Sequence, residues 1–365
     1  MLRYIVRRLL QAIPTLLGVT IFSFMLMSLA PGGFVRLAFG ENPAIRPQQR
    51  AQLEARMGLN DPLPVQYLRW LLGDDWMRRD TTGDGVADWS ILIPLDADGD
   101  GINEPPGRNR GILRLDFGES FSRRRPVVDL IGERVAATLE LGVTSLLVSL
   151  AVGLPIGILA AVWKGTWFDN ASRVLSVVVS AIPTFWLGLM LILIFSITLK
   201  NEAGRPLLPM IGRCATTAVG GCPPIYMRLE YLIMPVIVLS SGGIAIFSRF
   251  MRASMLDVIN QDYIRTARAK GLSNRNVWFK HGARNALIPI ATILGPSILG
   301  VLGGAVITET VFSWPGMGRF AVEAVFAKDY PVVMTTVVIG AVTTVLGFLL
   351  SDILYAVVDP RIRFN

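Results

Sequence analysis

Two short acidic strings carry the side chains most able to bind a metal ion. The second string, DADGDGINE, begins at Asp96 and places side-chain oxygens at loop positions 1, 3, 5 and 9, with glycine at position 6. An EF-type loop wraps Ca²⁺ with this spacing. The candidate ligands are Asp96, Asp98, Asp100 and Glu104. We expect such a site to be structural and weak, with a dissociation constant of roughly 10⁻⁴–10⁻³ M, as in extracellular modules.

The match to an EF-type loop is incomplete, and a second interpretation stays open. Gly107 stands at position 12, where that loop has a bidentate glutamate. The first string, from Asp80 to Asp88, has Thr82 at position 3 and no acid at position 12. The alternative is a pair of exposed Asp-Gly turns in a flexible insertion.

Two cysteines, Cys214 and Cys222, are the only ones in the chain, and they lie in a predicted outside loop. A disulfide is permitted in that compartment, and it would close a short loop containing Gly220 and Gly221. We expect this bond. Two free thiols are the alternative, since spacing alone does not fix the geometry that a disulfide needs.

Motifs for nucleotide binding and catalysis are missing. The sequence has no G-x-x-x-x-G-K-[ST] loop to cradle ATP phosphates, and neither an H-E-x-x-H nor a G-x-S-x-G motif. The only histidine, His281, lies in a predicted cytoplasmic loop. We therefore predict that the chain is not an enzyme and carries no cofactor of its own, apart from the Ca²⁺ considered above.

The elements that position these residues are predicted to be membrane helices. The chain is 52% hydrophobic and 17% charged, with a mean hydropathy of +0.52, whereas soluble domains carry roughly 25% charged residues. A bilayer core needs about 20 apolar residues per helix. Six stretches qualify: Leu9–Ala30, Ala136–Trp163, Ala171–Leu199, Tyr231–Phe247, Ala286–Thr308 and Val332–Val358. The fold class predicted is an all-α, polytopic membrane protein with six transmembrane helices.

The first stretch follows basic residues, as a cleavable signal peptide does. Its apolar run is longer than the roughly 7–15 residues of a signal peptide, so we interpret it as a retained anchor. Basic residues in the other loops set the orientation. The loop from Arg249 to Arg284 holds eight Lys and Arg residues against two Asp. The positive-inside rule then places this loop and both termini in the cytoplasm. The formal charge of +8 reports this orientation, and we predict no nucleic-acid partner.

The stretch Asp257–Leu272 in this basic loop is predicted to be a surface helix. Its spacing is helical, Gly271 is a natural stop, and Ser273 or Asn274 can cap a following short helix. From charge alone, a solvated basic loop beside anionic lipid is an equal alternative. A helix projecting into the cytoplasm would suit docking to another protein.

Longer motifs around this helix carry a resemblance to a known family. YIRTARAKGLS from Tyr263 and HGARNALIP from His281 resemble the cytoplasmic signature loop of binding-protein-dependent ABC permeases, in the dipeptide, oligopeptide and nickel branch. Segments elsewhere also resemble the first permease subunit of that branch: RYIVRRLLQAIP, LAPG, DFGES, RPVVDLI, TETVFSWPGMG and DPRIR. The loop departs from the general pattern at Arg265, Thr266 and Arg284, in ways that fit this branch.

The resemblance implies a type I ABC importer permease fold and a coupling helix seated on an ATPase subunit. The coupling residues would be Tyr263, Arg265, Thr266, Ala267, Arg268, Ala269, Lys270, Gly271 and Leu272. The implied partners are a second homologous permease, two ABC ATPases that hold ATP and Mg²⁺, an extracytoplasmic solute-binding protein, and lipid. The chain would lie in a bacterial or archaeal cell (inner) membrane.

The expected organisation follows from these assignments. Residues 1–30 form an anchor helix, 31–135 an extracytoplasmic segment with an inserted acidic region at about 71–113, 136–358 a five-helix permease core with coupling loop 249–285, and 359–365 a cytoplasmic tail. The predicted function is to form, with a second permease, the membrane path for di- or oligopeptides or related small solutes, nickel chelates included. A secondary transporter or channel subunit is the alternative, although no convincing internal repeat supports it.

Three residues in or near the spans also attract interest. Glu140 and Asp352 lie near the ends of predicted spans, where ionisable groups are rare, but we expect them to be hydrated. Pro183 either forms a pathway-lining kink in the third span or packs with its neighbours against the partner permease, and we favour packing.

Overall fold

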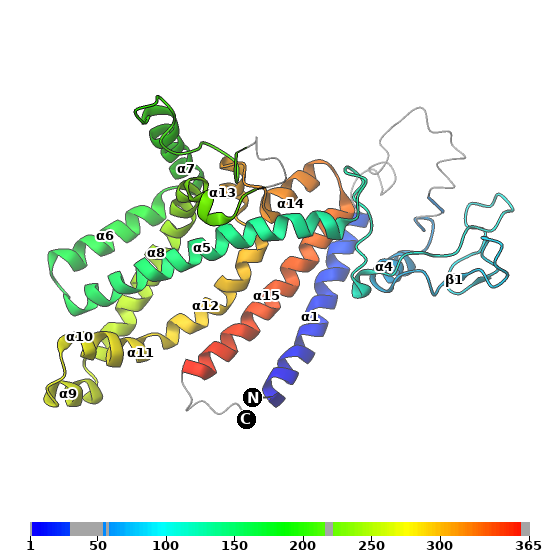
Figure 1. Cartoon of the computed structure of the whole chain (residues 1–365). Helices are drawn as coiled ribbons and strands as arrows, with labels where there is room; N and C mark the ends of the chain where they lie inside the picture. The colour runs from blue at the N-terminus through cyan, green and yellow to red at the C-terminus, as the bar shows by residue number, and fades with distance from the viewer. Residues whose placement is uncertain (1, 30–53, 56–57, 216–221, 359–365) are drawn as a thin grey trace. The chain divides into compact units, whose positions relative to one another are not determined.

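The computed structural model describes residues 2–29, 54–55, 58–215 and 222–358 of the chain (Figure 1). The chain divides into two compact units. Unit 1 consists of Met1–Ala12, Arg134–Phe320 and Gly340–Asn365, and unit 2 of Ile13–Glu133 and Ala321–Ile339. The described residues are mainly helical, which confirms the predicted all-α class.

Helices of very different length alternate along the chain. The longer ones are α1 (Leu2–Ser28), α4 (Leu63–Leu72), α5 (Val127–Val162), α6 (Trp167–Ala181), α7 (Thr184–Ile192), α8 (Leu229–Ile259), α12 (Ile288–Gly300), α14 (Met317–Phe326) and α15 (Tyr330–Val358). The shorter ones are α9 (Asp262–Ala269), α10 (Asn274–Asn276), α11 (Ala283–Ala286) and α13 (Val306–Val311). Three-residue 3₁₀ turns are η1 (Ile112–Arg114), η3 (Ile225–Met227) and η5 (Val301–Gly303), and π-helical turns are η2 (Leu193–Thr198) and η4 (Val277–Gly282). The strands β1 (Arg78–Arg79) and β2 (Trp89–Ser90) form one antiparallel pair.

Within the described residues, five helical segments are long and apolar enough to cross a membrane. They are Val6–Ser28, Val127–Val162, Leu229–Ile259, Ile288–Val311 and Tyr330–Ile353. The pair Trp167–Ala181 and Thr184–Thr198 supplies a sixth span if it is counted as one. Large apolar side chains on these helices are widely exposed, for example Val174 at 63%, as expected for surfaces that face lipid or another subunit.

The third span is broken, whereas the sequence predicted one continuous span, Ala171–Leu199. The two parts meet at 93°. Pro183 disfavours the helical conformation at the residue before it, and Ile182 is extended there, with φ −74° and ψ 124°. The proline therefore ends α6 and starts α7.

Close helix crossings in unit 1 depend on glycine. A Cβ at Gly157 of α5 would lie 2.6 Å from the carbonyl oxygen of Ser248 in α8, and a Cβ at Gly295 of α12 would lie 2.3 Å from the backbone nitrogen of Ser351 in α15. Small residues let membrane helices approach this closely. Beside the first crossing, Phe247, Met251 and neighbours from α5, α11 and α12 form a buried apolar cluster.

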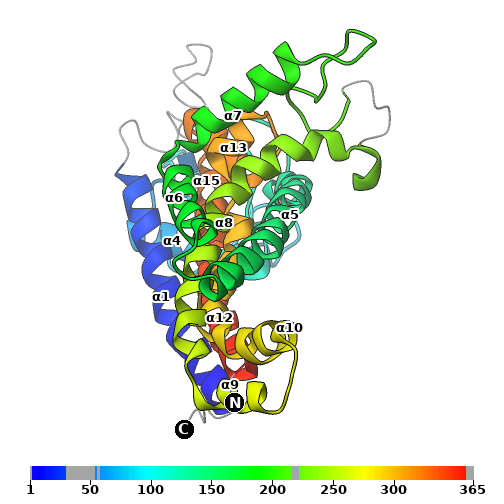
Figure 2. The ribbon, with the colours of Figure 1, turned by 90° about the vertical axis from the view of Figure 1, so that its left-hand side faces the viewer.

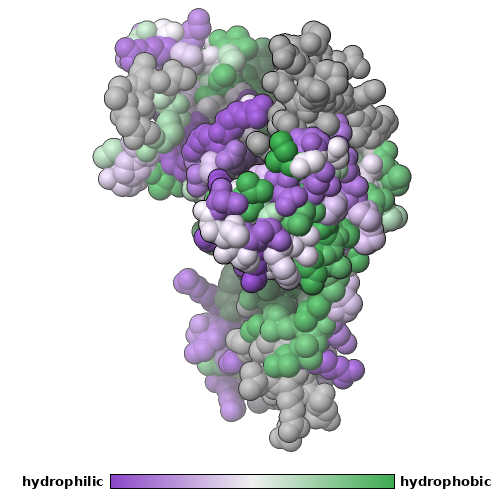
Figure 3. All heavy atoms as spheres, turned by 90° about the vertical axis from the view of Figure 1, so that its right-hand side faces the viewer, coloured by the Kyte–Doolittle hydropathy of each residue, from purple (hydrophilic) through white to green (hydrophobic). Residues whose placement is uncertain are grey.

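Unit 2 contains a folded hydrophilic segment held by buried ion pairs. Arg69 of α4 donates to Asp61 at 2.6 Å and to Asp74 at 2.9 Å, and all three side chains are almost fully buried. Asp74 also accepts the Asn109 N–H at 2.8 Å, which closes the segment at its far end. In a space-filling view, hydrophilic residues gather over the part that carries β1, and hydrophobic residues form patches elsewhere on the same face (Figure 3).

Candidate functional site

A short helix, α9, projects from the end of α8. Figures 1 and 2 show α9 and α10 at the end of unit 1 opposite to α7 and α13. The sequence predicted one helix over Asp257–Leu272, and this was wrong at its start. Residues up to Ile259 continue α8, Gln261 is extended (φ −73°, ψ 149°), and α9 begins at Asp262.

The inner face of α9 is fixed by a small apolar cluster. Ile264 and Val277 are fully buried and Ala267 is 6% exposed, and Val258 at the end of α8 packs against them. The guanidinium of the exposed Arg268 lies 4.5 Å from the centre of the Trp278 ring, which also packs against this cluster, a cation–π contact. α9 is therefore packed against the end of α8 and the following π-helical turn.

The end of α9 is a Schellman motif. The Leu272 N–H donates to the Ala267 carbonyl at 3.4 Å, and the Gly271 N–H donates to the Arg268 carbonyl at 2.9 Å. Gly271 has φ +73°, the left-handed conformation that glycine adopts without strain. The predicted helix stop at Gly271 is thus present, and Ser273 precedes α10 as its N-cap residue without a side-chain hydrogen bond.

The outer face of α9 gathers most of the residues predicted for coupling. Those exposed to solvent are Tyr263, Arg265, Thr266, Arg268, Ala269, Lys270, Gly271 and Leu272. Ala267 is the exception and belongs to the apolar cluster. Three cations therefore stand on a small exposed surface, which suits docking against a polar or acidic groove.

A buried ion pair that the sequence did not indicate joins α6 to α8 near this projection. Asp169, 1% exposed, accepts from the Arg252 Nε at 2.6 Å and Nη2 at 2.8 Å. The Gly165 N–H donates to the same carboxylate at 2.9 Å, and Arg173 lies 3.5 Å from it. Arg252 precedes the end of α8, so this bidentate contact connects the α5–α6 turn to the helix that carries α9.

Unit 1 also contains a cavity of about 260 Å³ between α5, α8, α12 and the α13 region. Its walls are mostly apolar, and its polar lining residues are Thr138, Ser145, Ser149, Ser297 and Glu309. Sequence reasoning missed this site because its residues come from four separate segments. The one local signal was an acid followed closely by several glycines.

Glu309 is a fully buried carboxylate at the wall of this cavity. It accepts the backbone N–H of Ala305 at 3.1 Å and of Arg319 at 2.8 Å, and the Thr138 hydroxyl at 3.2 Å. A Cβ at Gly316 would lie 2.3 Å from a carboxylate oxygen. Glycine is therefore required where this segment wraps the acid.

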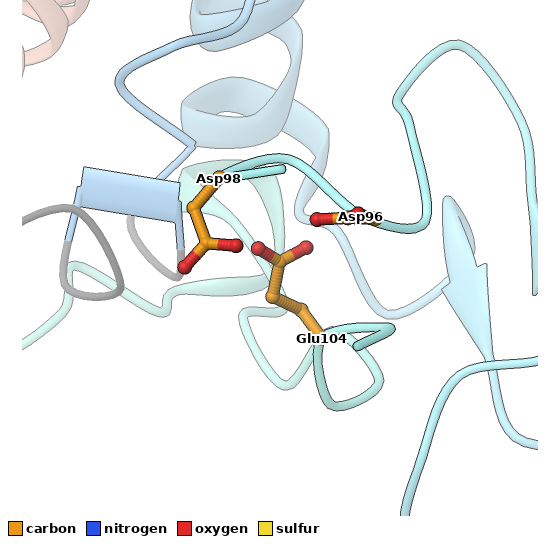
Figure 4. Close-up of side chains that lie close together, drawn as sticks. All are labelled: Asp96, Asp98 and Glu104. Carbon is orange, nitrogen blue, oxygen red and sulfur yellow. The ribbon is translucent and has the colours of Figure 1, made fainter. Parts of the chain in front are cut away.

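Three of the four predicted calcium ligands lie together in unit 2. The carboxylates of Asp96, Asp98 and Glu104 approach within 4.8 Å of one another (Figure 4). Asp100 is not part of this group, and one of its oxygens accepts the Ile102 N–H at 2.8 Å. Arg78 lies 3.3 Å from Glu104, with both side chains buried, so a cation would have to compete with this guanidinium. Burial lowers the pKa of Arg78, and the charge of Glu104 opposes that effect.

The first acidic string is satisfied internally and pairs with the second. Backbone N–H bonds from Gly85 and Gly83 hold the pKa of Asp80 below its ordinary value, and the Thr81 hydroxyl does the same for the pKa of Asp88. The Ala87 N–H donates to the Glu104 carbonyl at 3.2 Å, which ties one string to the other. The two strings are therefore packed turns, and Ca²⁺ binding stays a prediction.

Cys214 and Cys222 are joined by a disulfide with a Cα–Cα distance of 5.6 Å. The predicted loop glycines between them lie outside the described residues. Next to the bond, Glu140 pairs with Arg213 at 2.5 Å and with Arg228 at 2.6 Å. Glu140 was expected to be hydrated, but its side chain is 8% exposed and fixes this loop to α5.

Comparison with known proteins gives matches along the whole chain. The family model described as "Binding-protein-dependent transport system inner membrane component" matches residues 153–364, and that of its N-terminal part matches residues 1–92. The oligopeptide transport system permease protein AppB of Bacillus subtilis is 39% identical, with both chains covered in full. The dipeptide transport system permease protein DppB of Escherichia coli is 37% identical, with 100% of this chain and 99% of the relative covered.

A glutathione permease and a solved ABC transporter chain are also similar to this chain. The glutathione transport system permease protein GsiC of Salmonella paratyphi A is 35% identical, with both chains covered in full. Among solved structures, a chain of the MetNI methionine ABC transporter, in an inward-facing conformation, aligns with a TM-score of 0.48 and 19% identity, over 64% of this chain and 97% of that one.

Proposed function

This chain belongs to the family of binding-protein-dependent transport system inner membrane components, and on that premise we propose that it forms half of the membrane path of an ATP-driven peptide importer. The cargo class is inferred from the names of the relatives, which are oligopeptide, dipeptide and glutathione permeases. Family membership argues against the alternative of a secondary transporter or channel.

The proposed contact with the ATPase is the outer face of α9. The observation that carries it is the combination of an exposed basic surface with a fixed inner face, the buried cluster of Ile264, Ala267 and Val277. A docking element must transmit force, and a helix seated on a packed core does so better than a loop. Closing of two ATPases around nucleotide would then move α9 together with α8 and switch the bundle between two states.

Both chain ends are proposed to lie in the cytoplasm, on the same side as α9. The Arg8 guanidinium of α1 lies 3.2 Å from the Asp352 carboxylate of α15. This ion pair supports ends on a common side of the membrane, because it joins the first turns of the first span to the last turns of the last. The proposed membrane is a bacterial or archaeal inner membrane, in line with the family's description as an inner membrane component.

The remaining partners follow from the family. We infer a second, homologous permease, two ATPase subunits that hold ATP and Mg²⁺, and an extracytoplasmic solute-binding protein. The wide apolar exposure on α6, including Val174, Leu175 and Val177, gives surface for lipid and for the second permease.

The test is ATP hydrolysis by the complete importer in lipid, with binding protein present, with and without peptide. Ala269→Trp places a bulky side chain on the exposed face of α9, and Ala171→Trp makes the same change on an exposed position of α6. We expect peptide to stimulate hydrolysis in the wild type and in Ala171→Trp, and to fail in Ala269→Trp with assembly intact. Equal stimulation in all three would place the coupling contact elsewhere, and no response to any peptide would refute the cargo class.

A further inference from the structure

The few polar side chains that line the cavity in unit 1 are all hydrogen-bond acceptors toward a ligand. The hydroxyls of Ser145, Ser149 and Ser297 each donate to a carbonyl of their own helix, at 2.7–2.8 Å. A hydroxyl has one donor and two acceptor lone pairs. With the donors used in this way, these side chains retain only acceptors. Among the described residues that line the cavity there is no Lys, Arg or His.

Glu309 adds a buried negative charge to these acceptors. Each of its three partners, the Ala305 and Arg319 N–H groups and the Thr138 hydroxyl, donates to it. No ion pair to Glu309 is present within the described part of the chain.

A buried charge without a counter-ion is costly, and proteins usually pair it. Glu309 is fully buried beside the cavity. A cation in the cavity would therefore balance its charge across a short low-dielectric distance and not by direct contact. The other acceptors of the cavity favour a ligand group that carries several N–H donors.

We propose that this cavity is a cargo subsite that holds a primary ammonium group, the amino terminus of a peptide, with Glu309 as its counter-charge. This assignment rests on the proposed peptide cargo. The volume supports one end of a peptide and not a whole oligopeptide, because complete ligand pockets measure roughly 300–1,000 Å³ and this cavity about 260 Å³. The mostly apolar walls exclude a site built for a hydrated metal ion.

The first test does not depend on peptide transport. Ser297→Cys places a thiol in the cavity wall, and it is the only free thiol of this chain because Cys214 and Cys222 are bonded. The complete importer in lipid is treated with methyl methanethiosulfonate, and modification of this chain is followed by mass spectrometry. The probes are butylammonium chloride, butanol and sodium chloride at equal concentration.

We expect butylammonium to slow the modification, and butanol and sodium chloride to leave it unchanged. Glu309→Gln, which keeps the size of the side chain, should weaken the apparent affinity for butylammonium by about tenfold, the loss of one charge–charge interaction across the cavity wall. Glu323→Gln, a change at a surface acid, should not. Protection by butanol equal to that by butylammonium, or a Ser297→Cys thiol that never reacts, would overturn the proposal without any Glu309 variant.

The second test separates this proposal from the cargo class. Uptake of a peptide is compared with uptake of its analogue lacking the terminal amine, in wild type and in Glu309→Gln, with the same binding protein. The proposal requires a selective loss for the free-amine peptide. Equal losses for both cargoes would show that Glu309 only holds the fold. A wild type that takes up neither refutes the peptide cargo, while the thiol experiment still decides the ammonium site.

Discussion

Breaking the ion pair between Asp169 and Arg252 gives a direct measure of how α6 is held to α8. The perturbation is Arg252→Gln, with Asp169→Asn as the second arm of a double-mutant cycle. Asp169 is 1% exposed and the Arg252 side chain 19%, so water screens this pair far less than a surface pair. The two residues are in contact, and their effects should therefore be non-additive.

The magnitude follows from what remains after the change. Removing one partner of a buried pair typically costs about 3–5 kcal/mol. Here the Gly165 N–H still donates to Asp169 and Arg173 stays 3.5 Å away. We therefore expect a smaller loss of about 2 kcal/mol in the free energy of unfolding, with a coupling energy of about 1.5 kcal/mol.

The assay is equilibrium unfolding of the purified chain in mixed micelles, titrated with sodium dodecyl sulfate and followed by tryptophan fluorescence. The matched control is the exposed pair of Arg125 and Glu133, 2.7 Å apart with side chains 50% and 51% exposed. That pair should couple by about 0.5 kcal/mol or less. A coupling energy for the buried pair no larger than for the exposed one would refute the reasoning from burial.

Three further outcomes are expected. Gly157→Ala should lower the free energy of unfolding by about 1–3 kcal/mol, because the added Cβ would meet the backbone of α8. Gly340→Ala should not, since there is open space at that position. Equal effects of the two changes in thermal denaturation would contradict this expectation. The folded-state pKa values of Asp80 and Asp88 are lowered from 3.8. Their contribution to stability is therefore present above that pH and is lost as pH falls through the lower folded values. Limited acid proteolysis of the 78–105 segment should accelerate over that pH range, and a rate independent of pH would count against this expectation. Millimolar Ca²⁺ should slow neutral proteolysis of the same segment in the wild type and not in Asp98→Asn, and no effect of Ca²⁺ or of chelator would end the calcium prediction.

Features that depend on neighbouring residues were predictable from the sequence. Apolar runs of membrane length located the spans, because a helix must satisfy its own backbone in lipid. Gly271 marked the end of α9, since a left-handed residue there is cheap only for glycine. The start of that helix was misplaced, because Asp257, Val258 and Ile259 continue α8 and helical spacing does not distinguish one long helix from two short ones.

Pairings between distant segments were not predictable in the same way. Asp169 meets Arg252 across 83 positions of the chain, and Thr138 meets Glu309 across 171. No local pattern specifies which charges meet, because that depends on how helices cross. Glu140 shows the consequence, since its position near a span end suggested hydration and its two arginine partners bury it.

The sequence by itself determined the membrane-spanning class and the family, because hydropathy and motifs are properties of neighbouring residues, and it is the source of the proposed coupling segment. Only the tertiary structure decided that α9 stands on a packed apolar cluster, that the third span breaks at Pro183, and that Glu309 faces an acceptor-lined cavity. The physical reason is that burial and the partners of a charge are set by contacts between helices, and these contacts exist only after the chain has folded.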